Sequence, residues 1–175
     1  SSLFSANVNA YYTVWQNKPA NGGVTVMVDD VPFKANINGM DALHKGIEMD
    51  FAYKFTHNLS LEGLLSLGNW KWTSSDTVRF LDDNNNPITD DFGNEIISSF
   101  DADGVHVGDA AQTQYGLSVR FEPTHQSYIK LRGTYFDNYY ADCDPLSLNG
   151  ANAGRESWKI PAYQIIDLHC GYMFR

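Results

Sequence analysis

Long segments of this chain alternate between apolar and polar residues. From Ile47 to Phe55 every second residue is apolar, and polar or small residues stand between them. A period of two places the two sets on opposite faces of a β-strand, which a helix could not do. The pattern recurs, so we expect six strands, at about residues 5–16, 44–56, 58–73, 109–122, 126–141 and 162–175.

The connections between these segments are very unequal. Two are tight turns, Thr56-His57-Asn58 and Thr124-His125-Gln126, whereas residues 17–43, 74–108 and 142–161 form long polar connections. The segments also exceed the roughly 5–6 residues of a typical globular strand and the 9–11 that cross a bilayer. Short loops on one side and long loops on the other are typical of outer-membrane barrels.

The sequence therefore predicts an all-β fold, an antiparallel up-and-down transmembrane β-barrel. Six strands cannot close such a barrel, for which about eight are needed. The first residues, Ser1-Ser2-Leu3-Phe4-Ser5, do not have the charged and apolar regions of a signal peptide, and the sequence stops at Arg175 inside an alternating segment. We therefore expect residues 1–175 to be the late part of a single barrel domain, without a plug domain and without the last strands.

Charge and composition narrow the functional classes. The net charge of −9 argues against nucleic acid as a partner, because phosphate binding depends on Lys and Arg. Aromatic residues make up 14% of the chain, yet the mean hydropathy is −0.35, as expected for strands with one polar face. Acidic residues concentrate between Ser74 and Val107, where Arg79 is the only Lys or Arg, and this predicts one solvated loop.

The first long connection contains a candidate hairpin. Val24 to Val28 and Val31 to Phe33 are strand-like, and Asp29-Asp30 between them suits a turn. We expect a small hairpin above the barrel.

Aromatic residues near the strand ends suggest two girdles and, alternatively, a ligand site. Interfacial Tyr and Trp normally mark where a membrane wall meets water. Aromatics at outer strand ends also stack on ligands. The ligand-binding candidates are Trp70, Trp72, Tyr139, Tyr140 and Trp158.

Evidence for metal or catalytic chemistry is weak. Asp101 and Asp103 resemble the start of a calcium loop, but Gln112 stands where a bidentate Glu is required. The five histidines lack metal-ligand spacing, and no nucleophile elbow is present. Cys143 and Cys170 are expected in a loop and in the last strand, so a disulfide is not expected. We expect no enzyme, no resident metal and no cofactor.

Three segments resemble one known family. They are Asn38-Gly39-Met40-Asp41-Ala42-Leu43-His44-Lys45-Gly46-Ile47-Glu48, His106-Val107-Gly108-Asp109-Ala110-Ala111-Gln112-Thr113, and Ser157-Trp158-Lys159-Ile160-Pro161-Ala162-Tyr163 followed by Ile166-Asp167-Leu168. Their order and their positions at strand starts resemble the carboxy-terminal barrel of TonB-dependent outer-membrane receptors of the Bacteroidetes type.

The resemblance implies a plugged barrel of about 22 strands in the outer membrane of a Gram-negative bacterium. Such receptors take up scarce nutrients (siderophore, haem, cobalamin, glycan or peptide) with energy from TonB. The implied partners are membrane lipid, the receptor's own plug domain and the TonB complex, reached through an amino-terminal part, with a surface lipoprotein as a further candidate.

Two other functions fit the same alternation. A passive outer-membrane barrel, either a porin or an adhesin anchor, would have the same strands without a plug. A soluble β-sandwich that binds carbohydrate would pack its apolar faces together and use the same aromatics at loop ends. Lipid contact along the apolar face would separate the sandwich from both membrane alternatives.

Overall fold

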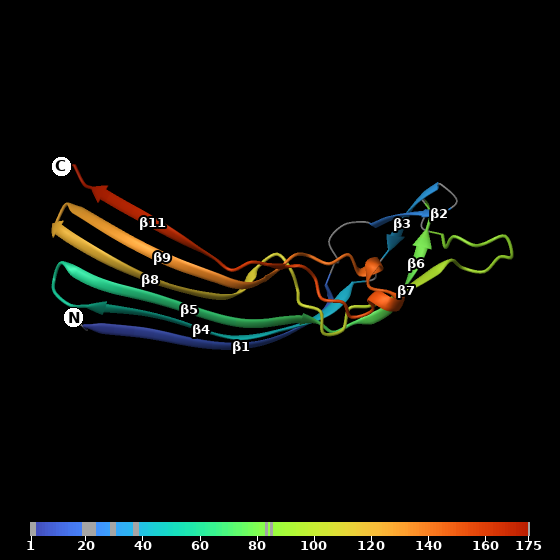
Figure 1. The fold of residues 1–175 in the computed structure, drawn as a ribbon, viewed down its shortest axis with the longest axis horizontal. Coiled ribbons are helices and arrows are strands. Elements are labelled where there is room, and N and C mark those ends of the chain that lie inside the picture. The colour runs from blue at the N-terminus through green and yellow to red at the C-terminus, as the bar shows by residue number, and fades with distance from the viewer. Residues whose placement is uncertain are drawn as a thin grey trace.

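The computed structural model describes residues 3–18, 24–28, 31–36, 39–82, 84 and 86–174. The chain is all-β, with antiparallel pairing throughout its two sheets (Figure 1). The six long strands are β1 (Phe4–Lys18), β4 (Met40–Lys54), β5 (Leu59–Trp72), β8 (Ala111–Thr124), β9 (Ser127–Tyr140) and β11 (Tyr163–Tyr172). Each matches one of the six segments that alternation predicts. No helix in the described ranges is long and apolar enough to cross a membrane.

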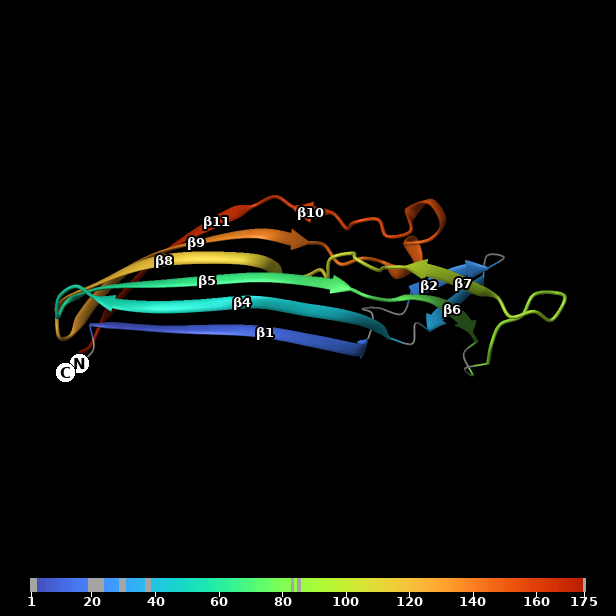
Figure 2. The ribbon, with the colours of Figure 1, turned by 90° about the horizontal axis from the view of Figure 1, so that it is seen from below.

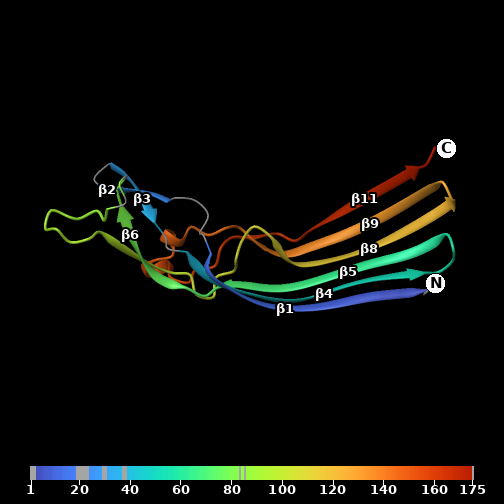
Figure 3. The same cartoon turned by 180° about the vertical axis from the view of Figure 1, so that it is seen from behind.

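The six long strands form one sheet, called here the wall. Strands β1, β4, β5, β8 and β9 lie side by side in this order, and β9 then pairs with the short β10 (Lys159–Ile160) and with β11. Long strands that pair in the wall also follow one another along the sequence, as in an up-and-down sheet. The two tight turns and both ends of the chain lie at one end of the wall, and the long connections lie at the other (Figures 1 and 3).

The register gives the wall one continuous apolar face. It carries the even-numbered residues of β1 and β11 and the odd-numbered residues of β4, β5, β8 and β9. One row across the sheet reads Phe4, Tyr53, Leu61, Val119, Leu131 and Leu168. The side chains of Leu117 and Leu131 are each 53% exposed, and the described residues place no second layer over them. This face is therefore both apolar and uncovered.

On β8 and β9 the opposite, polar face of the wall is the better shielded one. Ser118 and Thr134 are only 6% exposed, although they alternate with exposed apolar neighbours on β8 and β9. Lys130 Nζ lies 2.5 Å from Glu62 Oε2 in an ion pair between β9 and β5. Side chains on the inside of a curved sheet crowd one another. The burial of Ser118 and Thr134 therefore indicates that the polar face is the concave side of the wall, and Figure 2 shows the curvature of the sheet.

Glycines fit beside aromatic rings in the wall. A Cβ added to Gly63 on β5 would lie 2.2 Å from Cε1 of Phe51 on β4, which is too close for any side chain. Gly171 on β11 has the same relation to Tyr128 on β9. The rings thus cover the backbone of the neighbouring strand and help to set the register.

The long connections build a second region, called here the outer cap, from the described residues of 24–36, 73–110 and 141–158. Its sheet has the order β2 (Val24–Val28), β3 (Val31–Asn36), β6 (Ser75–Leu81) and β7 (Ile97–Asp101). Two 3-10 turns follow, η1 (Pro145–Ser147) and η2 (Gly150–Asn152). The pairing of β2 with β3 confirms the predicted hairpin, and its Asp29-Asp30 turn lies outside the described residues.

The interpretation of residues 74–107 as one solvated loop is wrong. This segment contains β6 and β7 and contributes Phe80, Phe100 and Val105 to a core. Leu148 enters from the third connection, and the start of β4 and the end of β5 close the core from below. These apolar residues are interspersed among the acidic ones along the sequence, so the net charge of the segment concealed its strands.

Candidate functional site

The outer end of β5 joins the wall to the cap. Pairing of β5 with β8 ends at Leu67 and Thr113, and residues 104–107 then take the place beside β5. The Trp72 N–H donates to the Val105 carbonyl at 2.8 Å, and the Val107 N–H donates to the Trp70 carbonyl at 3.0 Å. The cap therefore continues the hydrogen bonding of the wall.

Gln112 fastens this junction. Its side chain is 2% exposed, and its Oε1 accepts a hydrogen bond from the Trp70 N–H at 2.8 Å. Its Nε2 donates to the carbonyls of Trp70 and Val107 at 3.2 and 3.1 Å. A buried amide with both ends paired fixes the 104–107 segment against β5. The same residue occupies the position where a calcium loop would require Glu.

Four aromatic side chains gather on the polar face just below the cap. His44 stacks on Trp70, with ring centroids 5.2 Å apart, and Trp15 meets His44 edge to face at 6.3 Å. Trp70 Nε1 donates to the Tyr11 hydroxyl at 2.9 Å. The exposed Trp15 gives this cluster a flat surface on which a planar or apolar ligand group can stack.

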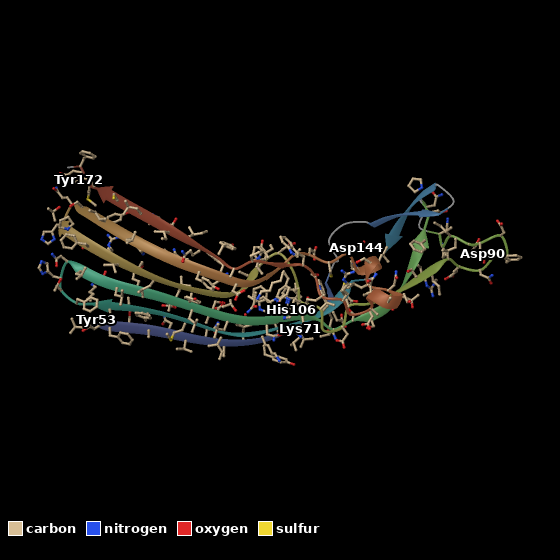
Figure 4. The ribbon with its side chains drawn as sticks, viewed as in Figure 1. Tyr53, Lys71, Asp90, His106, Asp144 and Tyr172 are labelled. Carbon is tan, nitrogen blue, oxygen red and sulfur yellow. The ribbon has the colours of Figure 1, made fainter. Side chains whose placement is uncertain are left out.

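A second aromatic contact links the second connection to the end of β9. The His106 ring lies parallel to Tyr140, with centroids 4.2 Å apart. Glu156 accepts hydrogen bonds from the His106 backbone N–H at 3.0 Å and lies 2.6 Å from its Nδ1. His106 also bridges to Lys71 on β5, and Figure 4 shows these two side chains close together. Glu156 thereby ties the third connection to the wall.

The five sequence-predicted aromatics do not form one site. Trp70 belongs to the cluster on the polar face, but Trp72 is buried in the cap core and Tyr140 lies under His106. Tyr139 pairs with Ala111 and lies on the parity of the apolar face. Trp158 is 68% exposed in the third connection. Register separates residues that lie at the same strand end, so the girdle at this end is less continuous than predicted.

Sequence reasoning missed several members of the two arrangements. Tyr11 and Trp15 share one parity of β1, and His44 stands directly opposite Trp70 in the register. The strand parity could have grouped these three residues with Trp70. The role of Gln112 had no such signal, because it depends on where the chain leaves the sheet.

Trp158 lines a separate cavity of about 320 Å³ in the third connection. Asp142, Asp144 and Arg155 also line it. The Asp144 carboxylate caps η1 by accepting from the Leu146 N–H at 3.0 Å. Carboxylate acceptors, a guanidinium donor and an indole surface together suit a small ligand that both donates and accepts hydrogen bonds.

Two acidic turns at the far end of the cap share one design. Asp82 Oδ1 accepts the backbone N–H of Asn86 at 2.8 Å, and Asp90 Oδ1 accepts that of Asn94 at 2.8 Å. In both turns the Asp N–H donates back to the Asn carbonyl. The sequence repeats Asp-Asp-x-x-Asn at these places, a turn signal that the solvated-loop interpretation overlooked.

These hydrogen bonds also set the acidity of the turns. Bonds from the side chain and backbone of Asn94 hold the pKa of the Asp90 carboxyl below its ordinary value. The Asn86 backbone and side chain do the same to the pKa of Asp82. Phe92, at the tip of the second turn, is 91% exposed. Figure 4 shows Asp90 at the end of the cap farthest from the wall.

The weak calcium candidates have turn roles of their own. Asp101 Oδ1 accepts hydrogen bonds from the Ser75 hydroxyl and from the Asp103 N–H. The Asp103 side chain is exposed beside it. Within the described ranges, no three His, Cys, Asp or Glu side chains are grouped to hold a metal ion. The acidic segment from Asp82 to Asn86 also contains Asp83 and Asn85, which lie outside those ranges.

Both cysteines are free thiols. Burial raises the pKa of the Cys143 thiol to about 11, and Cys170 is exposed on the parity of the apolar face. Neither lies in a redox or metal motif.

Comparisons of this chain with protein-family models, with curated proteins and with solved structures found no match.

Proposed function

We propose that this chain is part of the barrel wall of an outer-membrane receptor that takes up a scarce nutrient with energy from TonB. One observation carries the proposal. On β8 and β9, apolar residues such as Leu117 and Leu131 are exposed, whereas the polar residues Ser118 and Thr134 on the other face of the same strands are buried. A protein that met only water on both faces would bury the apolar set.

The apolar face has the dimensions that a bilayer requires. Strands β4, β5, β8 and β9 have 14 or 15 residues each, and about 9–11 tilted residues cross the hydrocarbon. At the tight-turn end this face carries Phe4, Tyr53, Phe121 and Tyr172, the residue types of an interfacial girdle. Figure 4 shows Tyr53 and Tyr172 at that end of the wall.

A soluble sandwich receives less support from the same contacts. In a sandwich the second sheet covers the apolar face of the first, at about 10 Å. The second sheet here belongs to the cap, and its core contacts the outer ends of β4 and β5 rather than Leu117 or Leu131.

The orientation follows from the connections. Long loops lie outside the cell in outer-membrane barrels, so the cap faces the medium and the tight turns face the periplasm. The cap and the aromatic cluster at Trp70 are then the first surfaces that a nutrient meets. The polar face, with its Glu62 to Lys130 ion pair, faces a lumen that holds the plug.

A partition experiment tests the proposal. The chain is refolded in detergent, mixed with phosphatidylcholine vesicles, freed of detergent and floated on a density gradient. We expect the wild-type chain to float and the L117D/L131D variant to lose the vesicles. The matched control is Ser60→Asp, which adds a carboxylate to the polar face between Lys54 and Arg120 in the register and should float.

Two results would contradict the proposal. One is a wild-type chain that stays monomeric in buffer without detergent. The other is equal flotation of all three proteins. A passive barrel would float in the same way, so uptake that stops when the TonB complex is disabled separates the receptor from a porin or an adhesin anchor.

A further inference from the structure

Two lysines share the apolar face of the wall, just above its hydrocarbon-like band. Lys45 on β4 stands opposite Tyr12 and Asn69, and Lys71 on β5 stands opposite Leu43. Both follow the parity of Ile47 and not that of the polar face. Lys45 is exposed and Lys71 is half-buried.

No acidic side chain neutralises these two lysines among the described residues. The ion pairs of that part of the chain include neither of them. The acids at the same level have other partners: Asp137 lies 2.9 Å from Lys159 Nζ, and Glu156 binds His106. Asp41 accepts a hydrogen bond from the Asn17 N–H and forms none of these ion pairs. Within the described residues, both ammonium groups are therefore left without a carboxylate at ion-pair distance.

The opposite end of the same face has no such charge. The other Lys and Arg residues of the long strands whose side chains the structure describes are Lys54, Arg120, Lys130 and Arg132, and all four have the parity of the polar face. At the tight-turn end the apolar face presents aromatic rings instead. Lysines on this face thus occur only where the wall meets the cap.

We propose that Lys45 and Lys71 bind the phosphate of an anionic lipid headgroup in the outer leaflet. This inference rests on the proposed membrane orientation. Two ammonium groups directly above an apolar band, with the exposed Tyr12 beside them, match a molecule that has acyl chains below and a phosphate above. A free phosphate ion would use the charges but leave the apolar band without a role.

Lipid retention measures this site. The refolded chain is placed in vesicles of phosphatidylcholine, or of phosphatidylcholine mixed with phosphatidylglycerol. Phosphatidylglycerol that remains on the protein after mild extraction is counted by native mass spectrometry. We expect wild type to enrich phosphatidylglycerol, and K45Q/K71Q to lose that enrichment by roughly 30-fold, from about one kcal/mol for each lysine. The matched control K54Q removes an exposed lysine from the polar face and should retain it.

The outcomes separate this inference from the function on which it depends. Equal enrichment in wild type and K45Q/K71Q would overturn the lipid site, and so would an equal loss of enrichment in K54Q. If the chain still inserts into phosphatidylcholine vesicles, the proposed membrane wall is not contradicted by either result. Inorganic phosphate and chloride are also added at the same ionic strength. If phosphate abolishes the enrichment more strongly than chloride does, lipid is overturned as the occupant of the site. A chain that enters neither vesicle overturns both proposals.

Discussion

The wall and the cap obey opposite burial rules within one chain. In the cap, Phe100 and Val105 are buried and the acidic turn at Asp90 is exposed. In the wall, Leu117 and Leu131 are exposed and Ser118 and Thr134 are buried. Both regions consist of antiparallel strands with alternating residues. The difference shows that alternation fixes the two faces of a strand but not the medium that each face meets.

The proposed function explains this contrast by a different solvent for each region. The cap has a closed core, as expected of a structure that water surrounds. The wall has none, so its apolar face requires a partner that is itself apolar. The hydrogen bonds of Gln112 and the cap core at Met40 and Trp72 join the two regions, and each region keeps its own pattern of buried and exposed residues.

The largest expected effect separates the two regions through the cap core. Phe100 is 3% exposed, and Phe100→Ala should remove about 3–5 kcal/mol from the free energy of unfolding of the cap, since it leaves a cavity. Hydrogen exchange should accelerate at the amides of β6 and β7 and stay unchanged at those of β8 and β9. Equal acceleration in all four strands would show that the cap and the wall unfold as one unit.

A charge on the apolar face should have the next largest effect. In a bilayer, Leu117→Arg should lower the stability of the wall by about 2–4 kcal/mol, because a guanidinium at mid-depth loses its hydration. Ser66→Arg is the matched control, since Ser66 lies on the polar face opposite Glu48. Urea unfolding of both variants in vesicles checks the prediction, and equal midpoints would contradict it.

Loss of the Gln112 clamp should cost less and should act only at the junction. Gln112→Ala leaves the Trp70 N–H and the Val107 carbonyl without their side-chain partner, at a cost of about 1–3 kcal/mol. Exchange of the Val107 amide should accelerate, and the Trp70 indole resonance should shift. Unchanged exchange at Val107 would mean that its bond to the Trp70 carbonyl holds the segment by itself.

Acid should produce the smallest effect, confined to the two Asp-Asp-x-x-Asn turns. The folded turns lower the pKa of Asp90 and Asp82 below the ordinary value of 3.8, so this contribution is complete above that pH and is lost as the pH falls through the lower, folded pKa. The Asn94 side-chain amide signal should therefore broaden only in strong acid. In Asp90→Asn, which cannot ionise, the Asn94 signal should not follow pH; a retained pH response would contradict the assignment.

The sequence predicted the wall well because its signal is local. Strand parity, the two tight turns and the split of Leu64 from Leu65 across the faces all follow from a period of two. The cap was predicted poorly, apart from the β2–β3 hairpin, because its core joins Phe80, Phe100 and Leu148 from separate connections. Charge density also concealed the apolar residues that stand between the acids.

The candidate site was predicted in part for the same reason. Trp70 was found as an aromatic at a strand end, but its partners Tyr11 and His44 come from two other strands. Strand ends indicate the level of a residue along the wall, and only register indicates its face. Trp72 and Tyr139 lie at the same level along the wall as Trp70. However, Trp72 is buried and Tyr139 lies on the parity of the apolar face, so neither joins the aromatic cluster.

Quenching of a fluorophore by brominated lipid tests the central claim most directly. Single cysteines at Leu117 and Gln114, on opposite faces of β8, are introduced into a C143A/C170A background, labelled and placed in vesicles of brominated phosphatidylcholine. We predict strong quenching from position 117 and little from position 114. Equal quenching at the two positions, or stronger quenching at 114, would contradict a wall whose apolar face meets hydrocarbon.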